Sequence, residues 1–252
     1  MTADRTEGIA PGVGSIQLAT DERPYFEETA LESLRSAVRR IHGDAGVRAV
    51  LVEGGTRRFC DGAPADALLA PDAALRIERL MTEAGRLVLD IPVPTIAVMS
   101  GHALGGGLML GLWCDLAVLA EESLYGANFL DLGFTPGMGS TALAEEMFGG
   151  PLGRELLLTG RLIKRREIRQ AGAPIGYSVA PRAQTRALAL RRATEIAALP
   201  PVAVAMLKRH LADRRGRRLT EALREEIAMH RDVFRLPQTR GRIAENHGGA
   251  AS

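Results

Sequence analysis

Apolar and polar positions follow two kinds of pattern in the N-terminal half of the chain. Apolar side chains recur at helical spacing from Phe26 to Ile41 and from Ala73 to Leu89, which predicts two helices with one apolar face each. Short apolar runs lie around these helices and are typical of buried strands. We expect strands over residues 16–19, 48–53, 95–99 and 115–120, and a further helix over 105–113. This order of strands and helices predicts an α/β architecture with parallel strand pairing.

The C-terminal part of the chain has a different pattern, because nearly every segment after Ser140 has helical periodicity. We expect breaks between helices where glycine or proline gathers, at 149–151, 171–181, 200–201 and Gly216. Leu219, Leu223 and Ile227 share one face of a predicted helix. This region is therefore predicted to pack on the α/β core or on another subunit.

One apolar stretch is long enough to be compared with a membrane span. Between residues 96 and 120, only His102 and Asp115 have side chains that can carry charge near neutral pH. The glycines at 101 and 105–107 break this run. It therefore predicts a buried strand, a tight turn and a buried helix rather than a membrane segment.

Composition narrows the possible functions. The 252 residues include 32 basic and 30 acidic side chains, so the chain has no overall field that would hold a nucleic acid. Cys60 and Cys114 cannot form a disulfide framework, lack metal-site spacing and suit a reducing compartment. Lysine occurs only at Lys164 and Lys208, which limits any mechanism that needs a lysine as acid or base.

The segment from Gly101 to Gly107 joins a predicted strand to a predicted helix and contains four glycines. Glycine costs backbone entropy but lets other groups approach the main chain closely. The N–H groups that open a helix have no partner within it, so they can bind an anion or a developing oxyanion. Close packing of the helix on the strand explains the glycines equally well. Both interpretations stay open from this segment alone.

A second segment, Phe59 to Ala63 with the sequence FCDGA, follows another predicted strand. Together the two segments resemble the enoyl-CoA hydratase/isomerase (crotonase) superfamily, and the resemblance extends from about residue 16 to about residue 243. It implies an α/β crotonase (ClpP-like) spiral of ββα units with a C-terminal helical region. Residues 1–195 would form the spiral core with its oxyanion hole. Residues 196–252 would form the helical region for trimerisation and active-site closure.

The chain departs from the hydratases of this family at the residues that handle water. Met109 and Phe129 stand where hydratases have two glutamates, and neither side chain can transfer a proton. Pro64 replaces the aspartate that commonly follows the oxyanion alanine. The resemblance therefore implies that the oxyanion hole is kept while the acid and base for hydration are lost.

Three further segments are similar to the decarboxylating crotonase homologues of polyketide β-branching. They are Tyr125–Phe129, Gly133–Gly139 and Glu225–His230. The implied activity is decarboxylation of a 3-methylglutaconyl-type thioester on an acyl carrier protein through a stabilised dienolate. An acyl-CoA hydratase, dehydratase or isomerase of the same fold remains an alternative. So does a non-catalytic homologue that binds an acyl carrier protein.

The resemblance also implies roles for individual residues. The backbone N–H groups of Ala63 and Gly106 would form the oxyanion hole, and His230 would donate a proton to the dienolate. Asn128 is interpreted either as a ligand of the substrate carboxylate or as a support of its loop. The residues implied in substrate binding are Gly62, Leu68, Met109, Asn128, Phe129, Pro136 and Gly137. No metal is expected, and no cofactor beyond the phosphopantetheine or CoA that carries the substrate.

This chain lacks a lysine that some members of the family have in the active site. Some members place a lysine about eight residues after the oxyanion alanine, near Ala70 and Pro71, where this sequence has none. The substrate carboxylate would then be anchored by Arg76, His230 or another group. Combined dehydration and decarboxylation also stays open.

The implied partner is an acyl carrier protein that bears the substrate, and the implied assembly is a homotrimer or hexamer in the cytoplasm. No nucleic acid or membrane partner is expected. Arg214, Arg215, Arg217 and Arg218 are interpreted either as a docking site for an acidic carrier or as the solvated start of a helix. His102 is expected to have a structural role.

Overall fold

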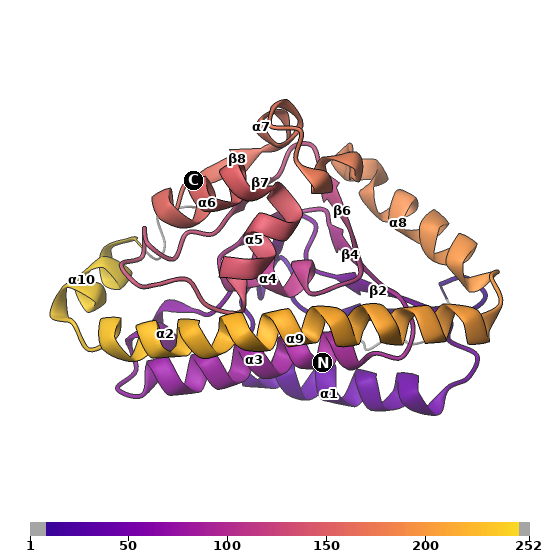
Figure 1. The fold of residues 1–252 in the computed structure, drawn as a ribbon, viewed down its shortest axis with the longest axis horizontal. Helices are drawn as coiled ribbons and strands as arrows, with labels where there is room; N and C mark the ends of the chain where they lie inside the picture. Colours follow the sequence, from indigo (N-terminus) through magenta and orange to yellow (C-terminus); the bar gives the residue numbers. More distant parts are fainter. Residues whose placement is uncertain (1–8, 247–252) are drawn as a thin grey trace.

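A computed structural model describes residues 9–246 of the chain (Figure 1). The first sheet is parallel, with the strand order β1-β2-β4-β6-β9. Its strands are β1 (Val13–Gln17), β2 (Ala49–Glu53), β4 (Thr95–Met99), β6 (Leu116–Ala120) and β9 (Val179–Ala180). All five residues of β4 are buried, as expected for a central strand with both faces covered. The strand expected over 16–19 begins three residues earlier, and β9 was not expected.

A second, smaller sheet has the order β3-β5-β7-β8. Its strands are β3 (Arg58–Cys60), β5 (His102–Leu104), β7 (Leu124–Gly126) and β8 (Leu162–Lys164). The tight turn expected after β4 is therefore wrong, because β5 forms there. Any side chain at Gly101 would overlap the backbone of Arg57, so the glycine lets this segment pair with β3. Strands of three residues leave too short a pattern for recognition from sequence.

The two sheets arise from a repeated unit of two strands and a helix. β2 and β3 precede α3 (Ala73–Asp90), β4 and β5 precede α4 (Gly106–Leu112), and β6 and β7 precede α5 (Ser140–Phe148). The expected spiral of ββα units with a C-terminal helical region is confirmed. The expected division between residues 195 and 196 falls inside α8 (Arg182–Ala197), and its outer ends, 1–8 and 247–252, lie outside the described residues.

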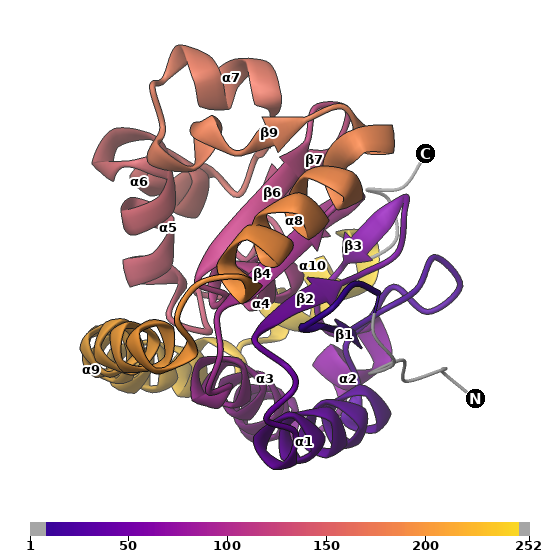
Figure 2. The same cartoon turned by 90° about the vertical axis from the view of Figure 1, so that its right-hand side faces the viewer.

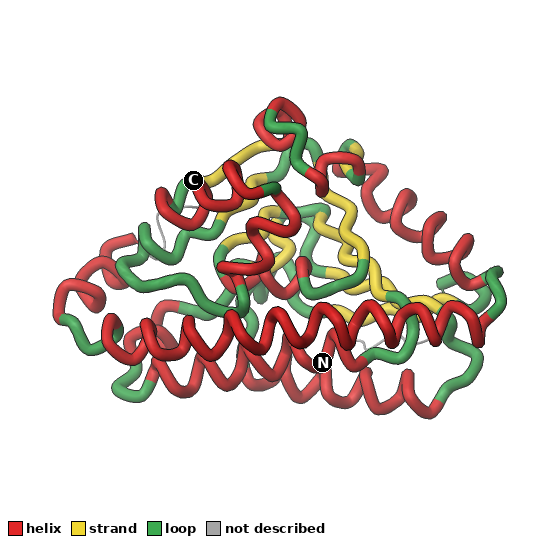
Figure 3. The backbone as a smooth tube through the Cα atoms, viewed as in Figure 1, coloured by secondary structure: helices red, strands yellow, loops and turns green. Residues whose placement is uncertain are grey.

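Helices surround the sheets (Figure 3). α8 packs on the first sheet. Along the base of the molecule, α3 lies between α9 (Pro201–Val233) and α1 (Glu28–Gly43) (Figures 1 and 2). The remaining helices are α2 (Ala65–Leu69), α6 (Gly150–Thr159), α7 (Arg165–Gln170), the 3-10 turn 174–177, and α10 (Pro237–Asn246). Within residues 9–246, no helix is both long and apolar enough to cross a bilayer.

The helix break expected at Gly216 is wrong, because α9 continues through this position. As a result, the arginines at 214–218 lie in the middle of α9 rather than at a solvated helix start. Arg215 is half-buried and donates hydrogen bonds to the carbonyls of Leu112, Trp113 and Cys114 at the end of α4. A guanidinium at this end also opposes the negative pole of the helix dipole. Arg215 therefore supports the core.

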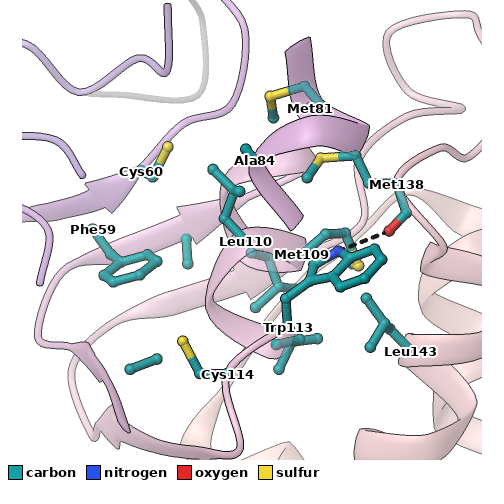
Figure 4. Close-up of a cluster of buried hydrophobic side chains, with 14 of the residues drawn as sticks. Phe59, Cys60, Met81, Ala84, Met109, Leu110, Trp113, Cys114, Met138 and Leu143 are labelled. Atoms are coloured by element: carbon teal, nitrogen blue, oxygen red, sulfur yellow. Dashed lines mark hydrogen bonds between the residues drawn. The ribbon is translucent and has the colours of Figure 1, made fainter. Parts of the chain in front are cut away.

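The main core fills the space between α3, α4 and the sheets (Figure 4). Trp113 lies at its centre and donates a hydrogen bond from Nε1 to the carbonyl of Met138 (3.1 Å). Cys60 and Cys114 are both free and fully buried, and burial raises the pKa of each thiol to about 12. The core thus joins β3, which ends at Cys60, to the loop that carries Met138.

The glycine at position 107 is predicted to be essential for packing. A Cβ atom there would overlap the carbonyl oxygen of Cys60, whereas a Cβ at Gly43 meets nothing within 4 Å. Gly107→Ala should lower the free energy of unfolding by about 1–3 kcal/mol or more. Gly43→Ala, the control, should change it by less than about 0.5 kcal/mol. Denaturant unfolding of the two variants measures the difference, and equal effects would contradict this account of the packing.

Candidate active site

A partly closed cavity of about 680 Å³, counting its open mouth, lies between α3, α9 and the two glycine segments. Its walls come from five parts of the chain, with lining residues in 61–68, 74–82, 105–106, 128–138 and 223–234. The cavity therefore brings together all the segments that carry the sequence resemblance.

The two glycine segments meet at one end of this cavity. Gly62 has a left-handed φ of 80°, and a Cβ placed on it would lie 3.2 Å from the Gly106 nitrogen. The first hydrogen bond inside α4 runs from Met109 N to Gly105 O (3.2 Å), so the Gly106 N–H precedes the helical ladder. Ala63, next to Gly62, also lines the cavity. The structure thus places the expected pair of backbone donors on neighbouring segments.

Most residues with an expected role lie on the cavity wall. They are Gly62, Ala63, Leu68, Gly106, Asn128, Phe129, Gly137 and His230. Met109 and Pro136 do not line it. Met109 is fully buried on the core side of α4, beside Trp113 and Met138 (Figure 4). A contact between Met109 and substrate is therefore not supported. Because position 109 is a methionine, this site still lacks the acid that hydratases have at that position.

His230 lies on α9 with its ring at the cavity wall. Its Nε2 is 2.6 Å from the carbonyl oxygen of Thr135. A carbonyl can only accept, so Nε2 carries the hydrogen and Nδ1 holds the lone pair of the neutral ring. Burial lowers the pKa of His230, although the Thr135 and Pro136 backbone contacts oppose this shift. The ring is therefore held in one tautomer and is hard to protonate.

Aromatic side chains surround His230. Its ring meets Phe134 and Phe234 edge-on, with centroid distances of 6.0 and 5.5 Å. Phe129 packs edge-on against Phe134 at 5.9 Å. A Cβ at Gly137 would lie 2.5 Å from His230 Cε1, so only glycine leaves room for the imidazole. Around His230 the wall is aromatic, and Asn128 and Glu226 are polar residues that also line the cavity.

Glu226 is a functional candidate that sequence reasoning missed. It lies one turn before His230 on α9, lines the cavity and is buried. Its Oε2 accepts from Gly139 N (2.6 Å), and its Oε1 accepts from Thr141 N (2.8 Å) and Thr141 Oγ1 (2.7 Å). Burial raises the pKa of its carboxyl, and these donors counteract that shift. The carboxylate thus caps the start of α5 from a distant helix.

The loop between Thr135 and Thr141 is therefore held by α9 at both ends, by His230 and Glu226. Met138 lies between them with a left-handed φ of 65°, which is unfavourable for a residue other than glycine. A Cβ at Gly106 would lie 3.0 Å from Met138 Sδ. The strained residue thus faces the oxyanion segment.

The candidate cavity contains no arginine or lysine among its described lining residues. Lys208 is buried and pairs with Asp115 (2.8 Å) behind the site, and Lys164 is exposed in β8. Arg76 is exposed and lies 3.9 Å from Asp72. None of these three residues is therefore placed to anchor a substrate carboxylate in the cavity. In residues 9–246, no group of three or more His, Cys, Asp or Glu side chains is arranged to hold a metal.

His102 lies next to the glycines but does not line the cavity. Its Nδ1 accepts a hydrogen bond from Leu124 N (2.9 Å), which joins β5 to β7. Burial lowers the pKa of this ring and so favours the neutral form that can accept. These contacts agree with the structural role expected for it.

Comparison with known proteins identifies the family. The enoyl-CoA hydratase/isomerase family model matches residues 8–245. The chain belongs to this family. Over 256 aligned residues it is 31% identical to the bacillaene synthase decarboxylase PksI of Bacillus subtilis (strain 168), covering 98% of this chain and all of that protein.

Solved structures of the family give the same picture. The ECH2 decarboxylase domain of CurF from Lyngbya majuscula matches with a TM-score of 0.84 and 30% identity over 94% of this chain and 96% of that one. An enzyme of a dehydratase/decarboxylase couple involved in polyketide β-branching matches with a TM-score of 0.84 and 28% identity over 96% and 97%. An enoyl-CoA hydratase from Bacillus anthracis matches less well, with a TM-score of 0.74 and 27% identity over 87% and 90%.

Replacement of Glu226 by glutamine tests its link to α5. The amide retains one acceptor but turns an NH₂ toward a backbone N–H that needs an acceptor. Glu226→Gln should therefore lower the free energy of unfolding by about 1–3 kcal/mol. Glu225→Gln, at the exposed neighbouring position, should change it by less than about 0.5 kcal/mol. Similar unfolding midpoints for the two variants would rule out the proposed cap.

Proposed function

We propose that this crotonase-family enzyme decarboxylates a 3-methylglutaconyl-type thioester in polyketide β-branching, with the substrate carried on an acyl carrier protein. The observation that carries the proposal is the close approach of Gly62 and Gly106 at the cavity, in a chain that has Met109 and Phe129 where the family's hydratases have glutamates. Full-length similarity to the decarboxylase PksI supports it. No cofactor beyond the carrier's phosphopantetheine is required.

The proposed reaction needs no base, but it needs groups that stabilise negative charge on the thioester oxygen. The bond to the carboxylate carbon breaks, CO₂ leaves, and its electron pair moves through the double bond to the thioester oxygen. The N–H groups of Ala63 and Gly106 would stabilise the dienolate oxygen, each contributing on the order of 10²–10³ in rate. A proton from the imidazolium form of His230 then gives a 3-methylcrotonyl-type thioester.

The apolar wall supports loss of the carboxylate. An ionised carboxylate beside Phe129 and Phe134 gives up water and gains no cation, so its neutral product CO₂ is favoured there. We assign Asn128 as the neutral group that orients the carboxylate. Its Oδ1 would lie 3.0 Å from a Cβ at Gly105, so its amide is next to the oxyanion segment.

Hydration of an enoyl thioester has less support. Two acidic side chains, Asp61 and Glu226, do line the cavity. Asp61 pairs with Arg58 at 2.6 Å, and both oxygens of Glu226 accept hydrogen bonds from α5. Neither is placed at the positions where the family's hydratases hold their glutamates.

We further propose that the protein is a homotrimer or hexamer in the cytoplasm. Val202, Met206 and Leu207 at the start of α9 are 72%, 69% and 58% exposed, which favours burial against another subunit. The two buried, unpaired thiols suit a reducing compartment.

Product analysis tests the reaction directly. Purified protein should release CO₂ from a 3-methylglutaconyl thioester of an acyl carrier protein and should not hydrate crotonyl-CoA. CO₂ capture and mass spectrometry of the carrier measure the two outcomes. Hydration without decarboxylation would replace the proposal by the hydratase alternative. Carrier binding without turnover of either thioester would favour a non-catalytic homologue.

The role of His230 predicts a pH profile. Because burial lowers its pKa below the usual 6.5, the imidazolium is lost as pH rises through that lowered value. Product formation should therefore fall with rising pH, starting below pH 6.5. His230→Gln keeps a donor for Thr135 O but cannot transfer the proton, so the rate should fall by about 10²–10⁴ and the profile should flatten. An unchanged rate and profile in this variant would remove His230 from the mechanism.

A further inference from the structure

A second hollow lies beside the candidate cavity. The two share Leu68, Ala74 and Phe234 on their walls, so they are direct neighbours. The second hollow lies where α2, the end of α9 and α10 come together at one end of the molecule (Figure 1). We infer that this hollow and its arginines form the docking surface for an acidic acyl carrier protein. The inference rests on the proposed function, because it names how the carrier of that substrate is bound.

The charge of the hollow is concentrated in three arginines, Arg231, Arg235 and Arg240, which we call the arginine rim. All three are exposed. Asp72 is the acidic residue among the described lining residues, and Arg76 already lies 3.9 Å from it. The hollow is therefore positive, whereas the inner cavity has no arginine or lysine among its described lining residues. The surface that would attract an anionic partner is thus separate from the inner cavity where the reaction is proposed to occur.

Apolar groups lie beside the arginine rim. Leu75, in the hollow itself, is 58% exposed, and Leu236, next to Arg235, is 40% exposed. Protein interfaces are enriched in arginine and depleted in lysine, and apolar contacts carry much of their binding energy. These residues come from α3, α9, α10 and the turn between α9 and α10. A surface of this kind fits the face of a protein better than a single phosphate group.

The rim is also anchored to the fold. Arg240 Nη2 donates to the carbonyl of Leu69 (2.7 Å), at the end of α2. α2 carries Leu68, which lines both hollows. A carrier bound at the rim would therefore lie beside the inner cavity that its pantetheine arm has to reach.

The other basic stretch of α9 provides a control. Arg217 lies 14 residues before Arg231, which is about 21 Å along the helix axis. Arg217 and Arg224 are exposed and line a different groove, between α3 and the middle of α9. We therefore compare two double variants, Arg231→Gln/Arg235→Gln and Arg217→Gln/Arg224→Gln. Each removes two positive charges from the C-terminal helical region, but at a different surface. Glutamine adds no acid next to His230, and Arg240 is left in place because it supports α2.

The test compares three thioesters of the same acyl group, on the acyl carrier protein, on free phosphopantetheine and on N-acetylcysteamine. The Arg231/Arg235 variant should lose about tenfold more kcat/KM with the carrier-bound substrate than with either small thioester. High salt should reduce the wild-type advantage on the carrier and have less effect on this variant. The Arg217/Arg224 variant should behave as wild type with all three substrates.

Two kinetic outcomes would overturn the inference. Equal losses on carrier and free phosphopantetheine would show that the rim recognises the arm's phosphate, and equal carrier losses in both double variants would show a diffuse charge effect. If no thioester releases CO₂, the proposed decarboxylation fails, but the docking surface can still be tested. Direct titration with phosphopantetheinylated carrier protein should then show binding that is about tenfold weaker only in the Arg231/Arg235 variant; equal affinity with wild type would reject the surface.

Discussion

The carboxylate of Glu226 links the C-terminal helix to the start of α5, and the geometry of the candidate site depends on this link. Through it, α9 fixes the position of the loop that carries Met138 and Gly137. One turn later the same helix supplies His230, which holds the other end of that loop. The unfavourable backbone of Met138 is retained because hydrogen bonds on both sides leave it no alternative. A helix remote in sequence thus completes a site that the glycine segments begin.

The sequence predicted those parts of the site that depend on local backbone requirements. Glycine at 62, 106 and 107 marks places where two segments nearly touch. The glycines alone fitted close packing equally well, and the family resemblance was needed to predict an oxyanion hole there. The buried strand β4 and the amphipathic α3 followed from apolar periodicity. Glu226 was missed because its partners lie 85 and 87 residues away, and nothing in its immediate sequence distinguishes it from exposed Glu225. Gly216 misled because glycine is tolerated in a long helix when neighbouring helices support it.

The arrangement also explains how one fold can exchange reactions. The backbone donors belong to the strand-to-helix connections and are costly to change, because the glycines beside them have no room for a side chain. The side chains at positions 109 and 129, by contrast, can vary without changing this backbone, and here both are apolar. In the proposed mechanism, stabilisation of an enolate oxygen therefore belongs to the fold, while the choice between adding water and losing CO₂ depends on replaceable side chains.

The burial of Cys60 has a practical consequence for observing motion in the site. Burial raises the pKa of this thiol to about 12 and shields it from reagents, so Cys60 should react slowly with alkylating reagents in the folded protein. Any side chain at Gly107 would overlap the carbonyl of this same residue, so exposing Cys60 requires its strand and α4 to separate. The rate at which Cys60 is modified therefore reports how often its strand and α4 come apart, without any substrate being present.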